Sequence, residues 1–205
     1  MRSSTPADLA GRCKHCWVQE RFCFCADVPR VETRTRFLVV RHGRETWKTS
    51  NTARIALLAL TRGRLLPYSV PGEPFDAAAL EAPNTWLLYP GASGPPAHAP
   101  PPEQVVVIDG SWSQARRMVH RLPQLRGLPR LSLPPPVPGT KRLRQPPHAD
   151  GMSTLEAIAE AVALLEGEEK AAPLRALHQR MVQAVWEGRG GMEAAIAALR
   201  GNAAP

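Results

Sequence analysis

Residues 104–118, QVVVIDGSWSQARRM, decide the fold expected for this chain of 205 residues. The run QVVVI is apolar without alternation, which is typical of a strand covered on both faces. Asp109 and Gly110 end that strand, and the residues from Trp112 to Arg121 predict a helix. A buried strand that turns directly into a helix is the building unit of α/β sheets.

Other strands and helices alternate around this unit. Asn51 is a suitable N-cap for one helix, and Ser153 with Glu156 forms the capping-box pattern S-T-L-E of another. Further strands are expected at 36–40, 85–89 and 128–133, and further helices at 51–62, 153–166, 173–187 and, as a short Ala-rich segment, 190–205. The Pro-rich stretches 91–103 and 134–139 are expected to be loops. The order predicts an α/β fold with a mostly parallel sheet and helices on both faces.

All four cysteines fall in one short stretch with the spacing C-x2-C-x6-C-x-C: Cys13, Cys16, Cys23 and Cys25. Four thiolates so close in sequence can converge on one tetrahedral zinc ion, in a closed site whose role is structural. Two disulfides or an iron–sulfur cluster are the alternatives. We therefore expect a zinc knuckle over residues 1–30, followed by a single compact unit over residues 31–205.

The net charge of +8 is unevenly distributed. Residues 1–64 hold 13 basic and 5 acidic residues (+8), residues 65–145 hold 8 and 5 (+3), and residues 146–205 hold 5 and 8 (−3). A basic N-terminal third favours an anionic partner such as nucleic acid, although a general bias toward Arg would also raise the charge. The sequence has no apolar run of about 20 residues and no secretory h-region near its first residue, so we expect a cytoplasmic protein without a membrane span.

Ligands of open α/β sheets bind beyond the carboxyl ends of the strands, where Asp109 lies. Asp109 could act as a base, serve as a charge anchor, or merely cap the following helix. Trp112 is either a core residue or a flat surface for a base. His42 and Glu45 have the spacing of a metal pair or of an acid–base couple, but no further metal ligands lie near them in the sequence. The absence of Gly-rich phosphate-loop motifs argues against the usual NTPase and dinucleotide-binding classes.

The sequence resembles the DTW-domain family in five motifs, which occur in the same order as in that family. They are the cysteine knuckle, HGRE with SNTAR, LLYPG, DGSWSQARRM, and RLR with STLEAIA, and they span residues 13–159. Ser111 stands where the family motif D-x-T-W has Thr, and keeps the hydroxyl. Gly43 and Ala53 stand where Pro and Gly are expected.

The resemblance implies a tRNA-uridine aminocarboxypropyltransferase, related to SPOUT-type enzymes and their knotted α/β core. Such an enzyme moves the 3-amino-3-carboxypropyl group of S-adenosylmethionine to N3 of a tRNA uridine and releases methylthioadenosine. By position and by motif Asp109 is the expected catalytic residue. The expected cofactor cradle consists of Thr52, Leu88, Tyr89, Pro90, Gly91, Gly110, Ser111, Trp112, Ser153 and Thr154. The expected contacts to tRNA phosphates, or to the cofactor carboxylate, are Arg41, Arg44, Arg54, Arg142 and Arg144.

Two other functions remain open at this point. A SPOUT-like RNA methyltransferase would use the same cofactor and pocket but transfer the methyl group. A non-catalytic zinc-knuckle module would bind RNA only.

The helix N-terminus at Ser153 and Thr154 is expected to hold the methionine carboxylate, because free N–H groups there attract anions. The protein is expected to be a monomer or a homodimer.

Overall fold

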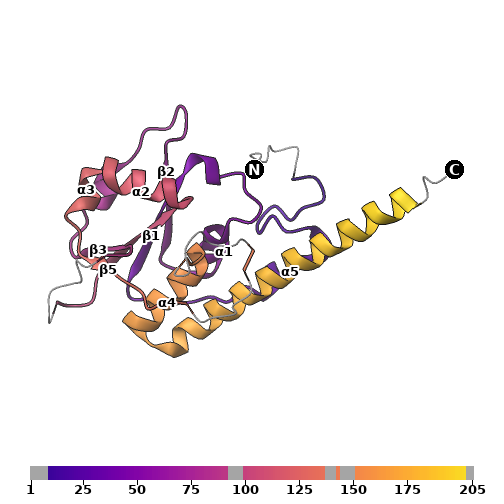
Figure 1. Cartoon of the computed structure of the whole chain (residues 1–205). Coiled ribbons are helices and arrows are strands. Elements are labelled where there is room, and N and C mark those ends of the chain that lie inside the picture. Colours follow the sequence, from indigo (N-terminus) through magenta and orange to yellow (C-terminus); the bar gives the residue numbers. More distant parts are fainter. Residues whose placement is uncertain (1–8, 92–98, 137–141, 144–150, 202–205) are drawn as a thin grey trace.

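The computed structural model describes residues 9–91, 99–136, 142–143 and 151–201, the last eleven by their backbone alone. Five parallel strands form one sheet in the order β2-β1-β4-β3-β5 (Figure 1). Their bounds are β1 Arg36–His42, β2 Gly63–Tyr68, β3 Thr85–Leu88, β4 Gln104–Asp109 and β5 Arg130–Leu131. The predicted α/β fold with a parallel sheet is confirmed, and the decisive strand β4 lies at its centre.

Helices cover both faces of the sheet, as predicted. Helices α1, α4 and α5 pack together on one face, and α2 and α3 lie on the other (Figure 1). The helices are α1 Thr52–Ala59, α2 Trp112–Arg121, α3 Pro123–Arg126, α4 Thr154–Glu166 and α5 Glu168–Gly201. Short 3-10 helices are η2 Glu20–Phe22, η3 Cys25–Asp27, η4 Gly43–Glu45 and η5 Ala77–Leu80. Within the described ranges, every helix is too short or too polar to span a bilayer.

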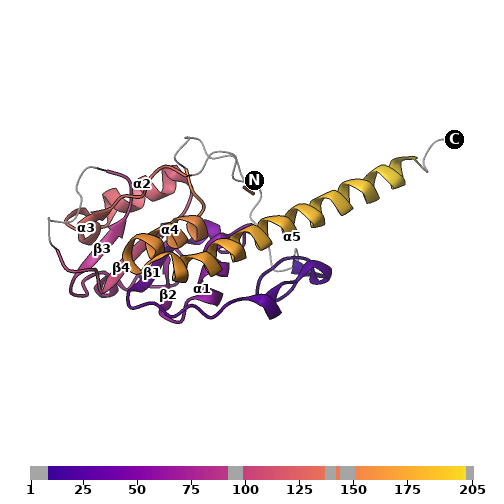
Figure 2. The same cartoon turned by 90° about the horizontal axis from the view of Figure 1, so that it is seen from below.

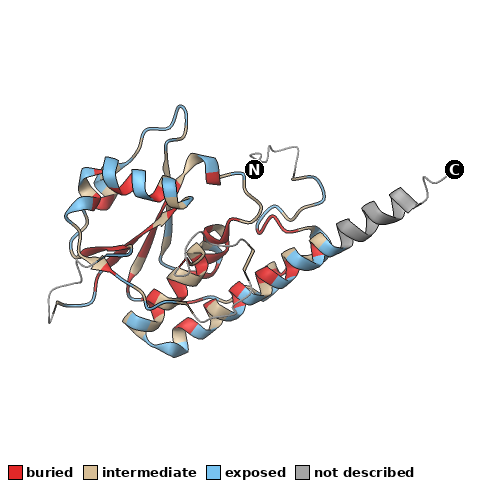
Figure 3. Ribbon diagram, viewed as in Figure 1, coloured by how far each residue is buried: buried red, intermediate tan, exposed pale blue. Residues whose placement is uncertain are grey.

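The central strands divide their side chains between two hydrophobic cores. Phe37 and Val39 of β1 join the core under α1, α4 and α5, whereas Leu38 and Val40 join the core under α2 and α3. Strand side chains alternate between the two faces of a sheet, so an unbroken apolar run fills both cores. Figure 3 shows the strands as the most continuously buried part of the chain.

Three elements differ from the sequence prediction. Strand β2 was not predicted; it contains Pro67 and pairs only with β1, and an edge strand tolerates a residue without an N–H group. Strand β5 comprises two residues of the six predicted at 128–133. The helices expected at 173–187 and 190–205 are one helix, α5, which begins a turn before Pro173 and continues through Gly190.

The cysteine-bearing segment packs on the body of the molecule. The aromatic ring of Phe24 is fully buried, and Cys16 and Val18 share the core that α1 and α5 also line. Gln19 donates a hydrogen bond to the carbonyl of Gly188 on α5 (3.5 Å). In Figure 2 this segment, in indigo, lies alongside α5. The knuckle and the helical layer therefore form a shared hydrophobic contact.

Candidate active site

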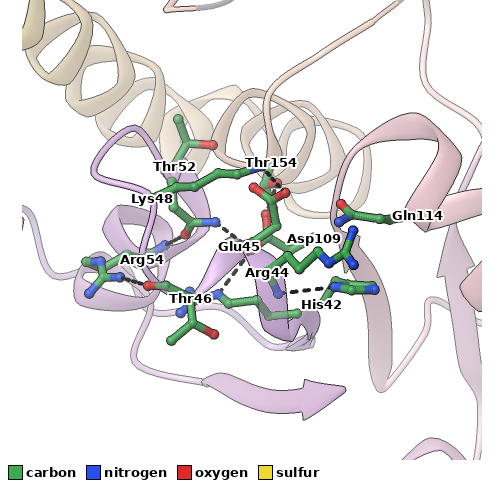
Figure 4. Close-up of polar contacts among 12 residues, drawn as sticks. His42, Arg44, Glu45, Thr46, Lys48, Thr52, Arg54, Asp109, Gln114 and Thr154 are labelled. Carbon is green, nitrogen blue, oxygen red and sulfur yellow. Dashed lines mark hydrogen bonds and ion pairs between the residues drawn. The ribbon is translucent and has the colours of Figure 1, made fainter. Parts of the chain in front are cut away.

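The carboxylate of Asp109 contacts side chains from three other elements: strand β1, the N-cap of α1 and the start of α4. Its Oδ2 accepts hydrogen bonds from Arg41 Nε (3.1 Å) and Asn51 Nδ2 (2.7 Å), and its Oδ1 accepts one from Thr154 Oγ1 (2.9 Å). Asp109 and Arg41 are both buried, with side chains 6% exposed, so they form a buried ion pair. Figure 4 shows Glu45 and Thr154 gathered around Asp109.

The ends of strands and the starts of helices bring Asp109 and its three hydrogen-bond partners together. Arg41 and Asp109 are register partners at the carboxyl ends of the neighbouring strands β1 and β4. Asn51 is the N-cap of α1; its Oδ1 accepts from the N–H of Arg54 (3.0 Å), which leaves its amide nitrogen to reach Asp109. Thr154 is the first residue of α4. Strand ends and helix starts therefore position every polar partner of the carboxylate.

An apolar cavity of about 540 Å³ lies on one side of this centre. The β3 end and the segment after β5 form its walls, together with the start of α2. Its lining residues are Leu88, Tyr89, Pro90, Gly91, Val107, Ile108, Gly110, Trp112, Ala115, Leu131, Ser132, Leu133, Pro134, Pro135, Met152, Thr154 and Ala157. Such a lining suits a flat ligand whose faces are apolar and whose edge carries a few polar atoms.

A second cavity of about 530 Å³ is lined in part by Asp109 itself, and we call it the polar cavity because charged side chains line it. Its lining residues are Glu45, Ser50, Asn51, Thr52, Asp109, Gly110, Ser111, Trp112, Ser113, Arg116, Arg142, Leu143, Gly151, Met152, Ser153, Thr154 and His178. Four residues line both cavities: Gly110, Trp112, Met152 and Thr154. The two cavities therefore adjoin beside Asp109, one suited to an apolar group and the other to charged groups.

The four cysteines form a compact cluster away from these cavities. Their sulfur atoms all lie within 4.8 Å of one another, and the pairs Cys13–Cys25 and Cys16–Cys23 are 3.7 and 3.9 Å apart. A tetrahedral zinc ion with Zn–S bonds of about 2.3 Å requires sulfur separations of about 3.8 Å. All four are free cysteines in the structure, so the geometry fits one metal ion better than two disulfides.

The thiols of the cluster differ in acidity. Burial raises the pKa of Cys13, but backbone hydrogen bonds at Cys16 and His15, together with side-chain hydrogen bonds to Cys23 and Cys25, lower that pKa to about 7. Burial is the main cause that raises the pKa of Cys25 above its ordinary value. Metal binding requires thiolates, so a cation at this position would release protons from the less acidic thiols.

Comparison with known proteins gives the family. The family model described as "DTW domain" matches residues 10–186. The chain belongs to the DTW domain family. No solved structure gives a significant match to this DTW chain.

Curated relatives of this DTW chain are named as transferases. "tRNA-uridine aminocarboxypropyltransferase 2" of Drosophila melanogaster is 27% identical over 192 residues, covering 86% of this chain and 76% of that protein. The protein of the same name in Macaca fascicularis is 24% identical over 177 residues, covering 78% and 58%. "tRNA-uridine aminocarboxypropyltransferase A" of Arabidopsis thaliana is 25% identical over 211 residues, covering 83% and 79%.

The structure brings all ten predicted cofactor residues of this DTW domain to the two cavities. Trp112 is half-buried and lines both, so it forms a cavity wall and not part of the core. Asp109 does not cap α2. The N-cap is Ser111, which forms a capping box with Gln114. The reason is that Asp109 is still the last residue of the strand, and its carboxylate is occupied by Arg41, Asn51 and Thr154.

The start of α4 is less available to an anion than predicted. The N–H of Ser153 donates to Glu156 Oε2 (2.8 Å), the N–H of Glu156 donates to Ser153 Oγ (3.4 Å), and the N–H of Leu155 donates to Thr52 Oγ1 (3.3 Å). The capping box and Thr52 thus use the N–H groups of residues 153, 155 and 156, which reduces the number of donors open to an anion. A carboxylate in the polar cavity depends more on the nearby arginines.

The predicted RNA-binding arginines occupy different environments. Arg44 is exposed, as a phosphate contact requires. Arg41 is buried and ion-paired with Asp109, an environment that does not favour a phosphate contact. Arg54 is half-buried over the ring of Trp17 and donates a hydrogen bond to the carbonyl of Thr46 (2.9 Å), so its guanidinium already has partners within the protein. Arg142 lines the polar cavity, and Arg144 lies outside the described residues.

Burial also lowers the pKa of Arg54, to about 10, with a smaller contribution from the positive charge of Arg41. At neutral pH Arg54 remains a cation, which suits its position over an indole ring.

Sequence reasoning considered Glu45 only as a partner of His42, and it missed the cavity residues Arg116 and His178. Glu45 is buried and ion-paired with Lys48, and it brings a second carboxylate to the polar cavity. Arg116 lies one turn into α2, and His178 reaches the cavity from α5. The position of Glu45 just after β1 was a usable signal, because strand ends carry ligand contacts in α/β sheets. His178, on a helix far along the chain, gave none.

Proposed function

We propose that this chain transfers the 3-amino-3-carboxypropyl group of S-adenosylmethionine to N3 of a tRNA uridine and releases methylthioadenosine. The observation that carries the proposal is the pair of adjoining cavities, one apolar and one charged, that meet beside the buried carboxylate of Asp109. The names of the relatives agree with this chemistry.

The cavities suit the two halves of the cofactor. Adenosine fits the apolar cavity against Tyr89 and Trp112, and the aminocarboxypropyl group extends into the polar cavity. The sulfonium then lies at the junction, where the indole of Trp112 favours a cation. Nη2 of Arg142 is buried without a hydrogen-bond partner among the described residues, and a carboxylate in this cavity would supply one.

The transfer requires little from the protein besides alignment. Uridine N3 forms a bond to the carbon beside sulfur while the carbon–sulfur bond breaks and its electron pair goes to sulfur. Holding both reactants in line makes the attack effectively unimolecular. The N3 proton must leave as the bond forms, and a carboxylate close to N3 assists that step.

Asp109 is the proposed acceptor of this proton. Its carboxylate has about four lone-pair sites, of which Arg41, Asn51 and Thr154 occupy three, so one remains for the uridine N–H group. Arg41 pairs with the carboxylate and holds its orientation. Glu45 lies in the same cavity and is the rival base.

We further propose that residues 1–30 form a structural zinc knuckle and that residues 31–205 form the catalytic unit, with a SPOUT-like knotted core, in a cytoplasmic monomer or homodimer. The sulfur separations support zinc, and a closed four-thiolate site stabilises the fold without taking part in catalysis. The positive excess in residues 1–64, including the exposed Arg44, supports tRNA as the macromolecular substrate.

The test is incubation of purified protein with unmodified tRNA and S-adenosylmethionine, followed by mass spectrometry of the nucleosides and of the by-product. We expect aminocarboxypropyluridine and methylthioadenosine in equal amounts. S-adenosylhomocysteine with methylated nucleoside would instead show a methyltransferase. Absence of both products, with tRNA still bound, would indicate an RNA-binding module.

Comparing variants separates the two carboxylates. Asp109→Asn is expected to abolish product, whereas Glu45→Gln is expected to retain part of it. The reverse order would assign the base to Glu45.

A further inference from the structure

Two tryptophans stack where the knuckle meets the loop after β1. The rings of Trp17 and Trp47 have centroids 5.7 Å apart and planes inclined by 13°. The guanidinium carbon of Arg54 lies 3.1 Å from the centroid of the Trp17 ring. Trp17 also donates from Nε1 to the carbonyl of Lys14 (3.2 Å). The stack therefore joins the knuckle, the loop and helix α1.

Only the outer member of the stack is accessible. Trp17 is 9% exposed, whereas Trp47 is 38% exposed. Trp17 also has a left-handed backbone conformation (φ 64°), which is uncommon for a residue other than glycine. The buried ring of Trp17 therefore supports the ring of Trp47, which is the one exposed to solvent.

Trp47 belongs to the loop that builds the polar cavity. Glu45 and Ser50, on either side of it in sequence, both line that cavity. Positive charges occur close to the two tryptophans in the chain: Arg44 and Lys14 lie three residues before Trp47 and Trp17 and are exposed, and Arg54 carries its charge beside the Trp17 ring. Figure 4 shows Arg44 and Arg54 on this loop and at the start of α1. An accessible aromatic ring among cations is the combination that binds single-stranded nucleic acid.

We propose that Trp47 is a stacking platform for a nucleobase next to the target uridine. This inference rests on the proposed function and specifies how the RNA is held. N3 lies on the Watson–Crick edge of uracil, so the base must leave any pair or stack before it enters the polar cavity. The neighbouring base then loses a stacking partner, and Trp47, close in sequence to the cavity residues, replaces it. Arg44 is placed to contact the connecting phosphates.

The test measures RNA binding separately from product formation. The probe is a single-stranded RNA nonamer with one central uridine, and its dissociation constant is measured at fixed salt for wild type, Trp47→Ala and Trp47→Phe. Trp186→Ala is the matched control, because Trp186 is also exposed (53%) but lies on α5. Loss of one base–aromatic stack is expected to weaken binding about 5- to 150-fold in Trp47→Ala. Trp47→Phe is expected to recover most of it, and Trp186→Ala to match wild type.

Other readouts distinguish this role from a structural one. Trp47→Ala is expected to raise KM for tRNA more than it lowers kcat, with methylthioadenosine binding and zinc content unchanged. A lower thermal midpoint with unchanged RNA affinity would overturn the proposal, as would a wild-type protein that does not bind the nonamer. If wild type binds RNA but yields no product, the proposed function fails, and the binding series still decides the role of Trp47.

Discussion

The buried pair of Arg41 and Asp109 allows a quantitative test of how the site is built. Replacing Asp109 by Asn removes the counter-charge of a guanidinium whose side chain is only 6% exposed. Asn51 and Thr154, which both donate to the carboxylate, then share one carbonyl oxygen and face an amide that is itself a donor. The variant therefore contains an unpaired buried cation and competing donors.

The expected cost follows from this burial. Breaking a buried ion pair by removing one partner costs about 3–5 kcal/mol of the free energy of unfolding. The stability of a domain is about 5–15 kcal/mol, so the variant should remain folded but clearly weakened. For a domain of this size, each kcal/mol corresponds to a fall of about 2–4 °C in Tm. We therefore expect Tm of Asp109→Asn to fall by about 6–20 °C.

A double-mutant cycle isolates the pair. Urea unfolding of wild type, Arg41→Met, Asp109→Asn and the double variant gives four free energies of unfolding. Because Arg41→Met removes the cation that Asp109→Asn leaves unpaired, the double variant should be more stable than the sum of single effects predicts, by about 1–3 kcal/mol. Additive effects, within about 0.5 kcal/mol, would refute the view that these charges stabilise each other.

Three further predictions address other parts of the molecule. Elemental analysis of the reduced protein should find about one zinc per chain, and Cys16→Ser should lose it. Trp112→Ala should weaken methylthioadenosine binding measured by calorimetry, because Trp112 lines both cavities. Burial raises the pKa of Glu166, but hydrogen bonds from Lys170 and from the backbone N–H groups of residues 34 and 35 outweigh it and hold that pKa below its ordinary value. The ionised Glu166 therefore stabilises the fold above about pH 4.3, and this stabilisation is lost as the pH falls through the lowered folded-state pKa. In urea unfolding, wild type should be more stable than Glu166→Gln at neutral pH, and the difference in the free energy of unfolding should disappear in acid.

Local sequence signals predicted the parts of the fold that local physics determines. The apolar run before Asp109 gave β4, and the caps at Asn51 and Ser153 gave the starts of α1 and α4 within a residue. Strand β2 was missed because Pro67 argues against a strand unless its edge position is known.

The sequence predicted which residues belong to the site but not which of them contact one another. The motifs located Asp109 and Thr154, yet their hydrogen bond spans 45 positions in the chain and depends on the sheet order. From the sequence alone, Arg41 is an arginine at a strand end, a position that suits phosphate binding. Its register opposite Asp109 shows that it is the buried counter-ion of that carboxylate.

The order in which the partners of Asp109 occur along the chain has a consequence for biosynthesis. Arg41 and Asn51 are made before Asp109, but Thr154 and the helix that covers this end of the sheet are made about 45 residues later. During translation, therefore, the first four strands can emerge while the charged pair still lacks its cover. The polar cavity is complete only after His178, residue 178 of 205, has been made, so a nascent or truncated chain that ends before α4 would lack lining residues of both cavities.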